Sequence, residues 1–299
     1  MSETTASLRR KIASAGDLQS VVRTMKSLAA SSIGQYERSV LALADYYRTV
    51  ELGLSACLRN HTPAALMKEP TGHAGAHVIG AVVFGSDQGL VGQFNEVIAD
   101  YAMTTLAALP GHAQVWAVGE RVHARLADGG VSLMRLFTVP NSVAAIAPLV
   151  GRILIESETF HQHGAVTELH LFYNRPTSAA GYAPFTQRLL PLDDSWRRTL
   201  VERPWPTRSV AEVMGDGTTT LRALIREYLF VSLFRACAES LASENASRLA
   251  AMQRADRNID ELLERLTGTF HRVRQSGIDE ELFDVVAGFE ALSDKRRDQ

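Results

Sequence analysis

The chain has 299 residues, of which 46% are hydrophobic and 21% charged, and its formal net charge is -2. These values are typical of a globular protein with a sizeable core, and they argue against disorder and against nucleic acid as the main partner. No apolar run reaches the ~18 residues of a membrane-spanning helix.

The termini and the cysteines indicate the compartment. The first five residues, MSETT, lack the basic and apolar regions of a signal peptide. Cys57 and Cys237 are the only cysteines and lie far apart in the sequence, which favours a reducing compartment and offers no metal cluster. We therefore expect a cytosolic protein, or one that partners hold at a membrane.

The distribution of proline predicts three parts. All ten prolines lie between Pro63 and Pro206. Because proline breaks the interior of a helix, residues 1–62 and 207–299 are predicted to be long helical arms that flank a central domain, residues 63–206. Helices of this length cannot bury an apolar face on one small domain, so each must pair with the other or insert into a partner.

The first arm carries a narrow apolar stripe. Its spacings alternate strictly between three and four residues from Ile33 to Cys57, which is typical of a coiled coil. The positions are Ile33, Tyr36, Val40, Leu43, Tyr47, Val50, Leu54 and Cys57, preceded less strictly by Leu8, Ile12, Ala15, Val22, Met25 and Ala29.

The middle of the chain alternates short β-rich runs with helical segments, which predicts an α/β layer with a largely parallel sheet. The expected strands are 77–86, 113–119, 133–139, 168–175 and 185–192, the last followed by a loop at Pro204 and Pro206. The expected helices are 94–109, 120–127 and 143–161.

Residues Gly85–Gly92 form a glycine-containing turn between the first strand and its helix. A helix amino terminus attracts anions, so the turn resembles a phosphate-binding site. Its spacing matches neither of the two common phosphate-binding motifs, and no lysine follows. A tight strand-to-helix turn, with Asp87 as a capping residue rather than a magnesium ligand, is the favoured interpretation.

Other polar clusters give no sign of catalysis. His161 and His163 lack further patterned metal ligands and are expected on the surface. Glu280, Glu281 and Asp284 are expected to form a solvated or partner-facing patch. We predict no catalytic residue, no cofactor and no metal.

The second arm shows the same mixed spacing, at Met252, Ala255, Ile259, Leu262, Leu266, Phe270 and Val273. Two arms with one stripe each predict a fold of the α+α/β class: a long antiparallel coiled coil of the N- and C-terminal helices plus a central Rossmann-like α/β domain. An ordinary helical bundle remains the alternative from the stripes alone. A nucleotide-binding α/β enzyme with helical extensions and an unrelated coiled-coil scaffold remain alternative functions.

Five segments together resemble the gamma subunits of rotary F-type ATP synthases. They occur in family order, at Asp17–Ser32 (DLQSVVRTMKSLAASS), Ser86–Asn95 (SDQGLVGQFN), Tyr173–Arg175 with Arg188–Leu192, Glu239–Met252 and Phe270–Gly288. The chain departs from the family pattern at Gln88, Val91, Asp279 and Phe289, which favours a divergent paralogue.

The resemblance implies a mechanical role without catalytic residues. The coiled coil would stand inside a ring of three alpha and three beta subunits, with the α/β domain against the epsilon subunit and the ring of c subunits. Arg274 and Gln275 would contact a beta-subunit loop, and Met25 and Lys26 would lie in the facing segment. The complex would hold the chain peripherally at the cytoplasmic face of a bacterial inner membrane.

Overall fold

The computed structural model describes residues 4–60, 78–162, 168–177, 181–209 and 212–297. The elements in chain order are α1 (Thr5–Asn60), β1 (Val78–Phe84), α2 (Phe94–Ala108), β2 (His112–Val118), α3 (Glu120–Asp128), β3 (Leu133–Phe137), α4 (Val143–Gln162), β4 (Glu168–Pro176), β5 (Tyr182–Leu190), α5 (Asp194–Glu202) and α6 (Gly217–Arg297).

The contacts within the chain define two units. Met1–Leu28 and Ala250–Gln299 form one unit, and Ala29–Leu249 form the other, so α1 and α6 contribute to both. The prediction of a long helix at each end is confirmed, and neither helix contains proline. The predicted division at residues 62/63 and 206/207 stays a prediction, and its first boundary lies outside the described residues.

The larger unit is built on a five-stranded sheet in the order β3-β2-β1-β4-β5. Strands β1 to β4 pair in parallel, and β5 pairs antiparallel with β4, with Tyr173 opposite Phe185. The predicted, largely parallel sheet is therefore confirmed. Helices connect the parallel strands because such connections must cross from one end of the sheet to the other.

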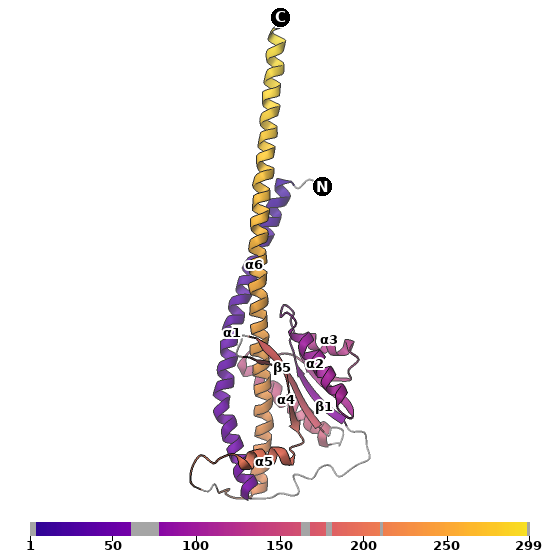
Figure 1. Ribbon diagram of the computed structural model, residues 1–299, viewed down its shortest axis with the longest axis vertical. Coiled ribbons are helices and arrows are strands. Elements are labelled where there is room, and N and C mark those ends of the chain that lie inside the picture. The colour runs from indigo at the N-terminus through magenta and orange to yellow at the C-terminus, as the bar shows by residue number, and fades with distance from the viewer. Residues whose placement is uncertain (1–3, 61–77, 163–167, 178–180, 210–211, 298–299) are drawn as a thin grey trace. The chain divides into compact units, whose positions relative to one another are not determined.

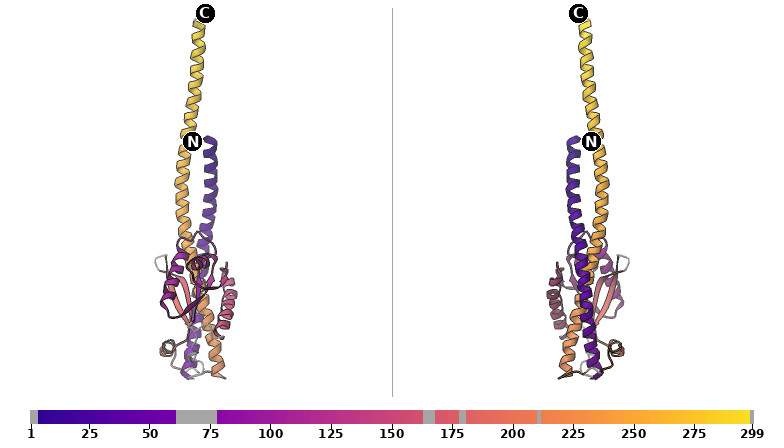
Figure 2. Two further views of the ribbon diagram at one scale, coloured as in Figure 1. Left: turned by 90° about the vertical axis from the view of Figure 1, so that its right-hand side faces the viewer. Right: turned by 90° about the vertical axis from the view of Figure 1, so that its left-hand side faces the viewer.

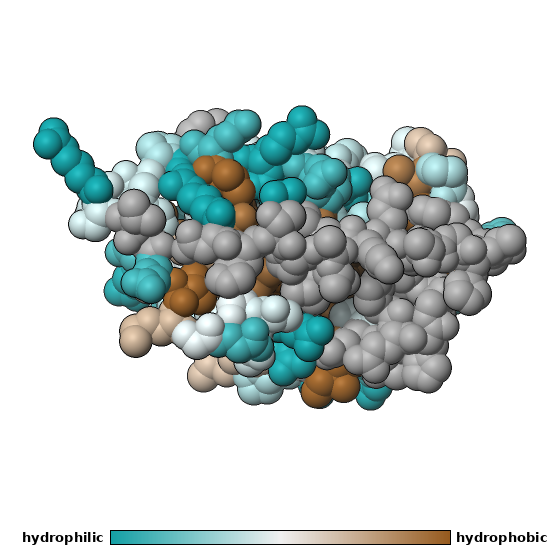
Figure 3. All heavy atoms as spheres, turned by 90° about the horizontal axis from the view of Figure 1, so that it is seen from below, coloured by the Kyte–Doolittle hydropathy of each residue, from teal (hydrophilic) through white to brown (hydrophobic). Residues whose placement is uncertain are grey.

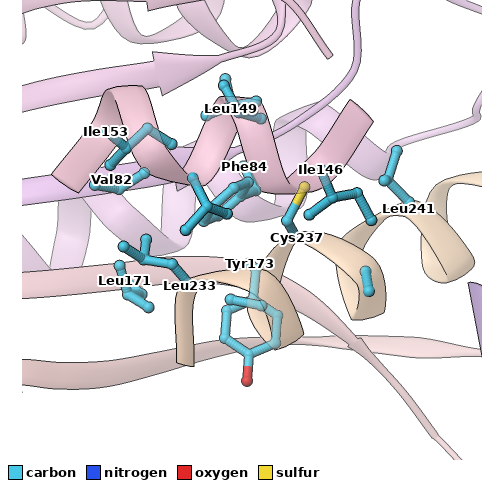
Figure 4. Packing of buried hydrophobic residues seen from close by; sticks show 14 of the residues in the cluster. Val82, Phe84, Ile146, Leu149, Ile153, Leu171, Tyr173, Leu233, Cys237 and Leu241 are labelled. Carbon is cyan, nitrogen blue, oxygen red and sulfur yellow. The ribbon is translucent and has the colours of Figure 1, made fainter. Parts of the chain in front are cut away.

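Helices cover both faces of this sheet (Figure 1). On one face α2 and α3 pack through residues such as Ile98 and Leu126, which are fully buried. On the other face α4 packs together with α6, and Tyr36 of α1 joins the same cluster. Figure 4 shows Cys237 of α6 within this layer, with Ile146 of α4 and Phe84 of β1. The carboxyl-terminal arm is thus itself one layer of the α/β domain.

A second cluster of apolar side chains joins α5 to the two long helices. Leu200 and Trp196 of α5 pack with Leu54 of α1 and Tyr228 of α6. The expected loop at Pro204 and Pro206 is present, and α5, which was not predicted, precedes it. The end of the unit that carries α5 shows mainly hydrophilic side chains with separate hydrophobic ones between them (Figure 3).

The smaller unit is an antiparallel pair formed by the first residues of α1 and the later residues of α6. Its buried apolar side chains are Leu8, Ala15 and Met252, and the stripe around them is half-buried. The predicted stripe is correct except at Leu262, which is 39% exposed, whereas Leu263 is half-buried. The inward-facing positions after Met252 are Asp256, Ile259 and Leu263. A stripe drawn from apolar residues alone passes over Asp256 and therefore selects Leu262.

Candidate functional site

The turn after β1 lies where a Rossmann-like sheet usually binds its ligand. The neighbours of β1 are β2 and β4, so the strand order reverses beside β1, and ligands bind outside the carboxyl ends of such strands. Here the chain's own groups fill this position. Asp87 accepts hydrogen bonds from the backbone N–H of Glu120 (3.1 Å), at the start of α3, and from that of Val139 (2.9 Å).

Further hydrogen bonds tie the same turn to its neighbours. The amide of Asn174 in β4 donates to the carbonyl of Phe94 (2.9 Å), where α2 begins, and Asn95 accepts from the backbone N–H of Ser86 (2.9 Å). On the far side the hydroxyl of Ser247 in α6 donates to the carbonyl of Val91 (2.5 Å). The structure therefore supports Asp87 as a capping residue and joins this turn to α6.

A second polar cluster, separate from the turn after β1, connects β4 to α6. Arg235 Nε donates to Glu239 Oε1 (2.7 Å), and Arg175 Nε lies 3.6 Å from the other carboxylate oxygen. Burial raises the pKa of Tyr173, whose hydroxyl points out of the apolar core (Figure 4). A cavity of about 220 Å³ lies beside the cluster, and Tyr47 and Gln187 are among its lining residues. Glu239 thus pairs with one arginine from its own helix and with one from β4, so the cluster links α6 to the sheet.

A second buried carboxylate on α6, that of Glu244, was not predicted from the sequence. Burial raises its pKa, and the guanidinium of Arg248, 2.5 Å away, opposes this increase. Asp87 also contributes to the raised pKa of Glu244. The spacing of Glu244 and Arg248 by four residues on a helix was the available signal, because such pairs face each other.

In the smaller unit, charged side chains meet across the helix pair. Lys26 Nζ lies 2.7 Å from Asp256 Oδ2, and Arg23 Nε lies 3.2 Å from Asp256 Oδ1. The hydrogen bond from Lys26 is the main cause of the lowered pKa of Asp256. Gln19 donates to Asp260 one turn further along α6.

The four residues predicted to contact a partner lie at two different levels of this unit. Met25 and Lys26 are half-buried, and Lys26 pairs with Asp256, whereas Arg274 and Gln275 are exposed. Phe270 lies under the guanidinium of Arg9 near the start of α1, at 5.4 Å from its ring centre. Arg274 and Gln275 follow Phe270 by about one helical turn, level with the first residues of α1, and the structure does not bring them together with Lys26.

Beyond this level α6 continues without α1 beside it (Figure 2). The side chains of this segment, residues 274–287, include five large hydrophobic ones that are exposed in the chain alone: Ile278, Leu282, Phe283, Val285 and Val286. Glu280, Glu281 and Asp284 are exposed between them, as predicted. We call residues 274–287 the distal segment.

The described part of the chain offers neither a metal cluster nor a membrane-spanning helix. Within it no group of three or more His, Cys, Asp or Glu side chains is arranged to hold a metal ion. His161 is near the end of α4, and His163 lies outside the described residues. Across the same residues no helix is both long enough and apolar enough to cross a membrane.

Comparisons with known proteins cover almost the whole chain. Residues 4–292 match the ATP synthase family. The ATP synthase gamma chain of Moorella thermoacetica is 28% identical over 293 residues, covering 95% of this chain and 98% of that one. The gamma chain of Rhizobium rhizogenes is 28% identical over 295 residues, with the same coverage of both chains.

Solved structures show the same fold. A chain of the Euglena gracilis mitochondrial ATP synthase, from a structure of OSCP, F1 and c-ring, aligns with a TM-score of 0.66 at 16% identity, covering 96% of this chain and 94% of that one. A chain from the central stalk and c-ring of the Tetrahymena thermophila enzyme aligns with a TM-score of 0.55 at 19% identity, covering 79% and 99%. The chain belongs to the ATP synthase family, and its match along almost its whole length identifies it as a gamma subunit.

Proposed function

We propose that this chain is the rotating central stalk of a bacterial F-type ATP synthase and carries no catalytic residue itself. Its partners are the alpha and beta subunits around the helices, and the epsilon subunit and c ring at the α/β domain. In this assembly the chain is peripheral, at the cytoplasmic face of the cell membrane. Contacts with an asymmetric shaft favour different conformations of the beta subunits in turn, which couples rotation to ATP synthesis or hydrolysis.

The observation that carries this proposal is the distal segment. Exposed side chains such as Leu282 and Phe283 have no cover from α1, and a cluster of large apolar groups on one exposed helix marks an interaction site. Arginine and glutamine at 274 and 275 stand where this segment begins. A helix that presents large apolar side chains and hydrogen-bonding side chains to its surroundings suits insertion into a ring of partner subunits.

The packing of α6 supports transmission of torque. Leu233, Cys237 and Leu241 of α6 are buried in the core that also contains β1, β4 and α4. Protein cores are close-packed and deform little, so a force on the α/β domain passes to α6 through packed side chains rather than through a hinge. The ion pairs of Glu239 with Arg235 and Arg175 join the same helix to the sheet.

Co-purification tests the assembly. A tagged chain expressed in its native host is expected to retain alpha and beta subunits when membranes are solubilised. The isolated chain is expected to hydrolyse no ATP. Failure to retain either subunit, in several detergents, would refute the central-stalk proposal.

The assignment of Arg274 has its own test. We expect Arg274→Ala to assemble normally but to lower ATP synthesis severalfold, because a charged hydrogen bond to a partner contributes roughly 1.5–3 kcal/mol. Arg265→Ala is the matched control, since Arg265 is an exposed arginine on the same helix. Equal synthesis rates in membranes that carry Arg274→Ala and the unchanged chain would contradict the contact.

A further inference from the structure

Asp256 is a charged residue at an inward-facing position of a hydrophobic stripe. It lies between Met252 and Ile259 on α6 and is only 9% exposed. A carboxylate that is removed from water destabilises a fold unless cations and hydrogen-bond donors compensate it. Its presence between apolar residues therefore calls for a specific reason.

The hydrogen bonds given to this carboxylate come from one short segment of α1. Lys26 donates at 2.7 Å to one oxygen of Asp256, and Arg23 donates at 3.2 Å to the other. Gln19 lies 3.5 Å from the second oxygen. The side chains of Arg23 and Lys26 remain 58% and 36% exposed, so only the carboxylate is withdrawn from water.

The apolar residues of this unit specify the pairing of the helices weakly. Among those with described side chains, only Leu8, Ala15 and Met252 are buried, and the other inward-facing stripe residues are half-buried. Because the stripe repeats about every seven residues, a shift of one heptad would again place apolar residues opposite apolar residues. Ala15 and Gly16 have side chains too small to interlock with the opposite helix, so they do little to oppose such a shift.

The same shift would remove both present cations from their places beside Asp256. A shift of one heptad in one direction places it beside residues 16–19, which are Gly, Asp, Leu and Gln. A shift in the other direction places it beside residues 30–33, which are Ala, Ser, Ser and Ile, and brings Lys26 to the present position of Gln19, the most distant of the three partners. Asp256 would then face another carboxylate or keep only one distant cation, and a buried charge that loses its partners is strongly destabilising.

We propose that Asp256 is the residue that fixes the register of the helix pair, by accepting hydrogen bonds from Lys26 and Arg23. A single polar residue in a coiled-coil stripe sets register at a cost in stability. If the chain is a rotor, as proposed above, the register decides where α1 ends along α6 and which residues of the distal segment stay uncovered. Lys26 is thereby assigned to a contact within the chain.

Cysteine cross-linking with a short bismaleimide in the full chain tests the register directly. The pair Arg9→Cys with Phe270→Cys reports the native register, because these two side chains are in contact, and Arg9→Cys with Leu263→Cys or Gly277→Cys reports a shift of one heptad. Without further change, only the native pair is expected to cross-link. In the Asp256→Leu background we expect cross-linking of the shifted pairs to rise by roughly tenfold or more, since the penalty of an unpaired buried ion is removed.

Two controls isolate the effect of Asp256. Single-cysteine variants give the background from the buried Cys57 and Cys237. Asp260→Leu is the matched variant, because Asp260 also contacts Gln19 and Arg23 but its side chain is 58% exposed. The inference is overturned if Asp256→Leu keeps only the native cross-link, or if Asp260→Leu shifts the register equally.

A second measurement separates this inference from the proposed function. In the assembled complex, Asp256→Leu is expected to lower ATP-driven ion pumping severalfold relative to ATP hydrolysis, a ratio that a simple change in stability would not alter. Shifted cross-links with unchanged coupling would leave the register assignment standing and overturn its link to rotation. A complex that never forms with the unchanged chain would instead overturn the proposed function alone.

Discussion

At the scale of single residues, Gly119 shows how closely the turns of the sheet edge approach one another. It lies between β2 and α3 with φ of +117°, and a Cβ there would lie 2.8 Å from the backbone of Ser86. We expect Gly119→Ala to lower the free energy of unfolding by about 2 kcal/mol or more, because both the conformation and the contact become strained. Urea unfolding of the isolated chain measures this change.

Gly151→Ala provides the matched control for that experiment. Gly151 lies inside α4, and a Cβ there meets no atom within 4 Å. Alanine favours helix over glycine, so this variant is expected to be more stable by about 0.5–1 kcal/mol. Equal effects of the two substitutions would contradict the close approach at Ser86.

The buried carboxyl of Glu244 gives a pH dependence whose direction follows from its environment. Burial raises its pKa in the folded chain despite the attraction of Arg248, so the folded chain binds a proton more readily than the unfolded one. The contribution of protonated Glu244 to the free energy of unfolding is fully present below the unfolded pKa of about 4.3. It is lost as pH rises through the higher pKa of the folded chain. Glu244→Gln, which stays neutral, should therefore be more stable than the unchanged chain at pH 8.

Unfolding experiments at several pH values test this prediction. The advantage of Glu244→Gln should shrink as pH falls from 8 toward about 4, where the unchanged chain binds the proton itself. Glu261→Gln, at an exposed position of the same helix, should show a much smaller dependence on pH. An advantage that grows as pH falls would show that the pair with Arg248 outweighs burial.

At the scale of elements, the apolar stripe of α6 allows a test with two adjacent leucines. Leu263 is half-buried against α1, whereas Leu262 is 39% exposed. We expect Leu263→Asp to destabilise the helix pair by about 1–2 kcal/mol, since roughly half of a leucine side chain is lost from the interface and a charge replaces it. Leu262→Asp should have a smaller effect, and hydrogen exchange of residues 5–28 compares the two.

The comparison of these leucines shows what the sequence could and could not predict. Spacings of three and four residues identified Tyr36, Val50 and Leu54 correctly, because burial of an apolar stripe requires only local periodicity. The same spacing rule selected Leu262 instead of Leu263, because it counts apolar residues only and so passes over the charged Asp256, which faces inward. Its burial depends on Lys26, 230 positions away in the sequence.

The short helix α5 and the hydrogen bonds of Asp87 at the sheet edge were not predicted, for different reasons. Asp193 caps α5 by accepting from the backbone N–H of Trp196 (2.9 Å), and this aspartate before an amphipathic segment was a usable signal. The two partners of Asp87, in contrast, are the first residue of α3 and a residue after β3, which only the order of the strands brings together. Local patterns therefore predicted the elements, whereas the site contacts required the topology.

At the scale of the whole molecule, stability and assembly are expected to depend on different residues. Buried groups such as Leu233 and Tyr173 hold the α/β domain to α6. The distal segment contributes nothing comparable to the chain alone, because its large hydrophobic side chains are exposed. A substitution in that segment should consequently change binding to partners without changing the fold.

The double variant Phe283→Ser with Val286→Ser tests this separation. Its free energy of unfolding should stay within about 0.5 kcal/mol of the unchanged chain, as for most surface substitutions. Retention of alpha and beta subunits during purification should fall severalfold, because apolar contacts with the ring are lost. Glu281→Gln, an exposed polar change in the same segment, should leave retention intact. Retention unaffected by the double variant would show that the ring does not cover these side chains, and the distal segment would no longer support a rotor.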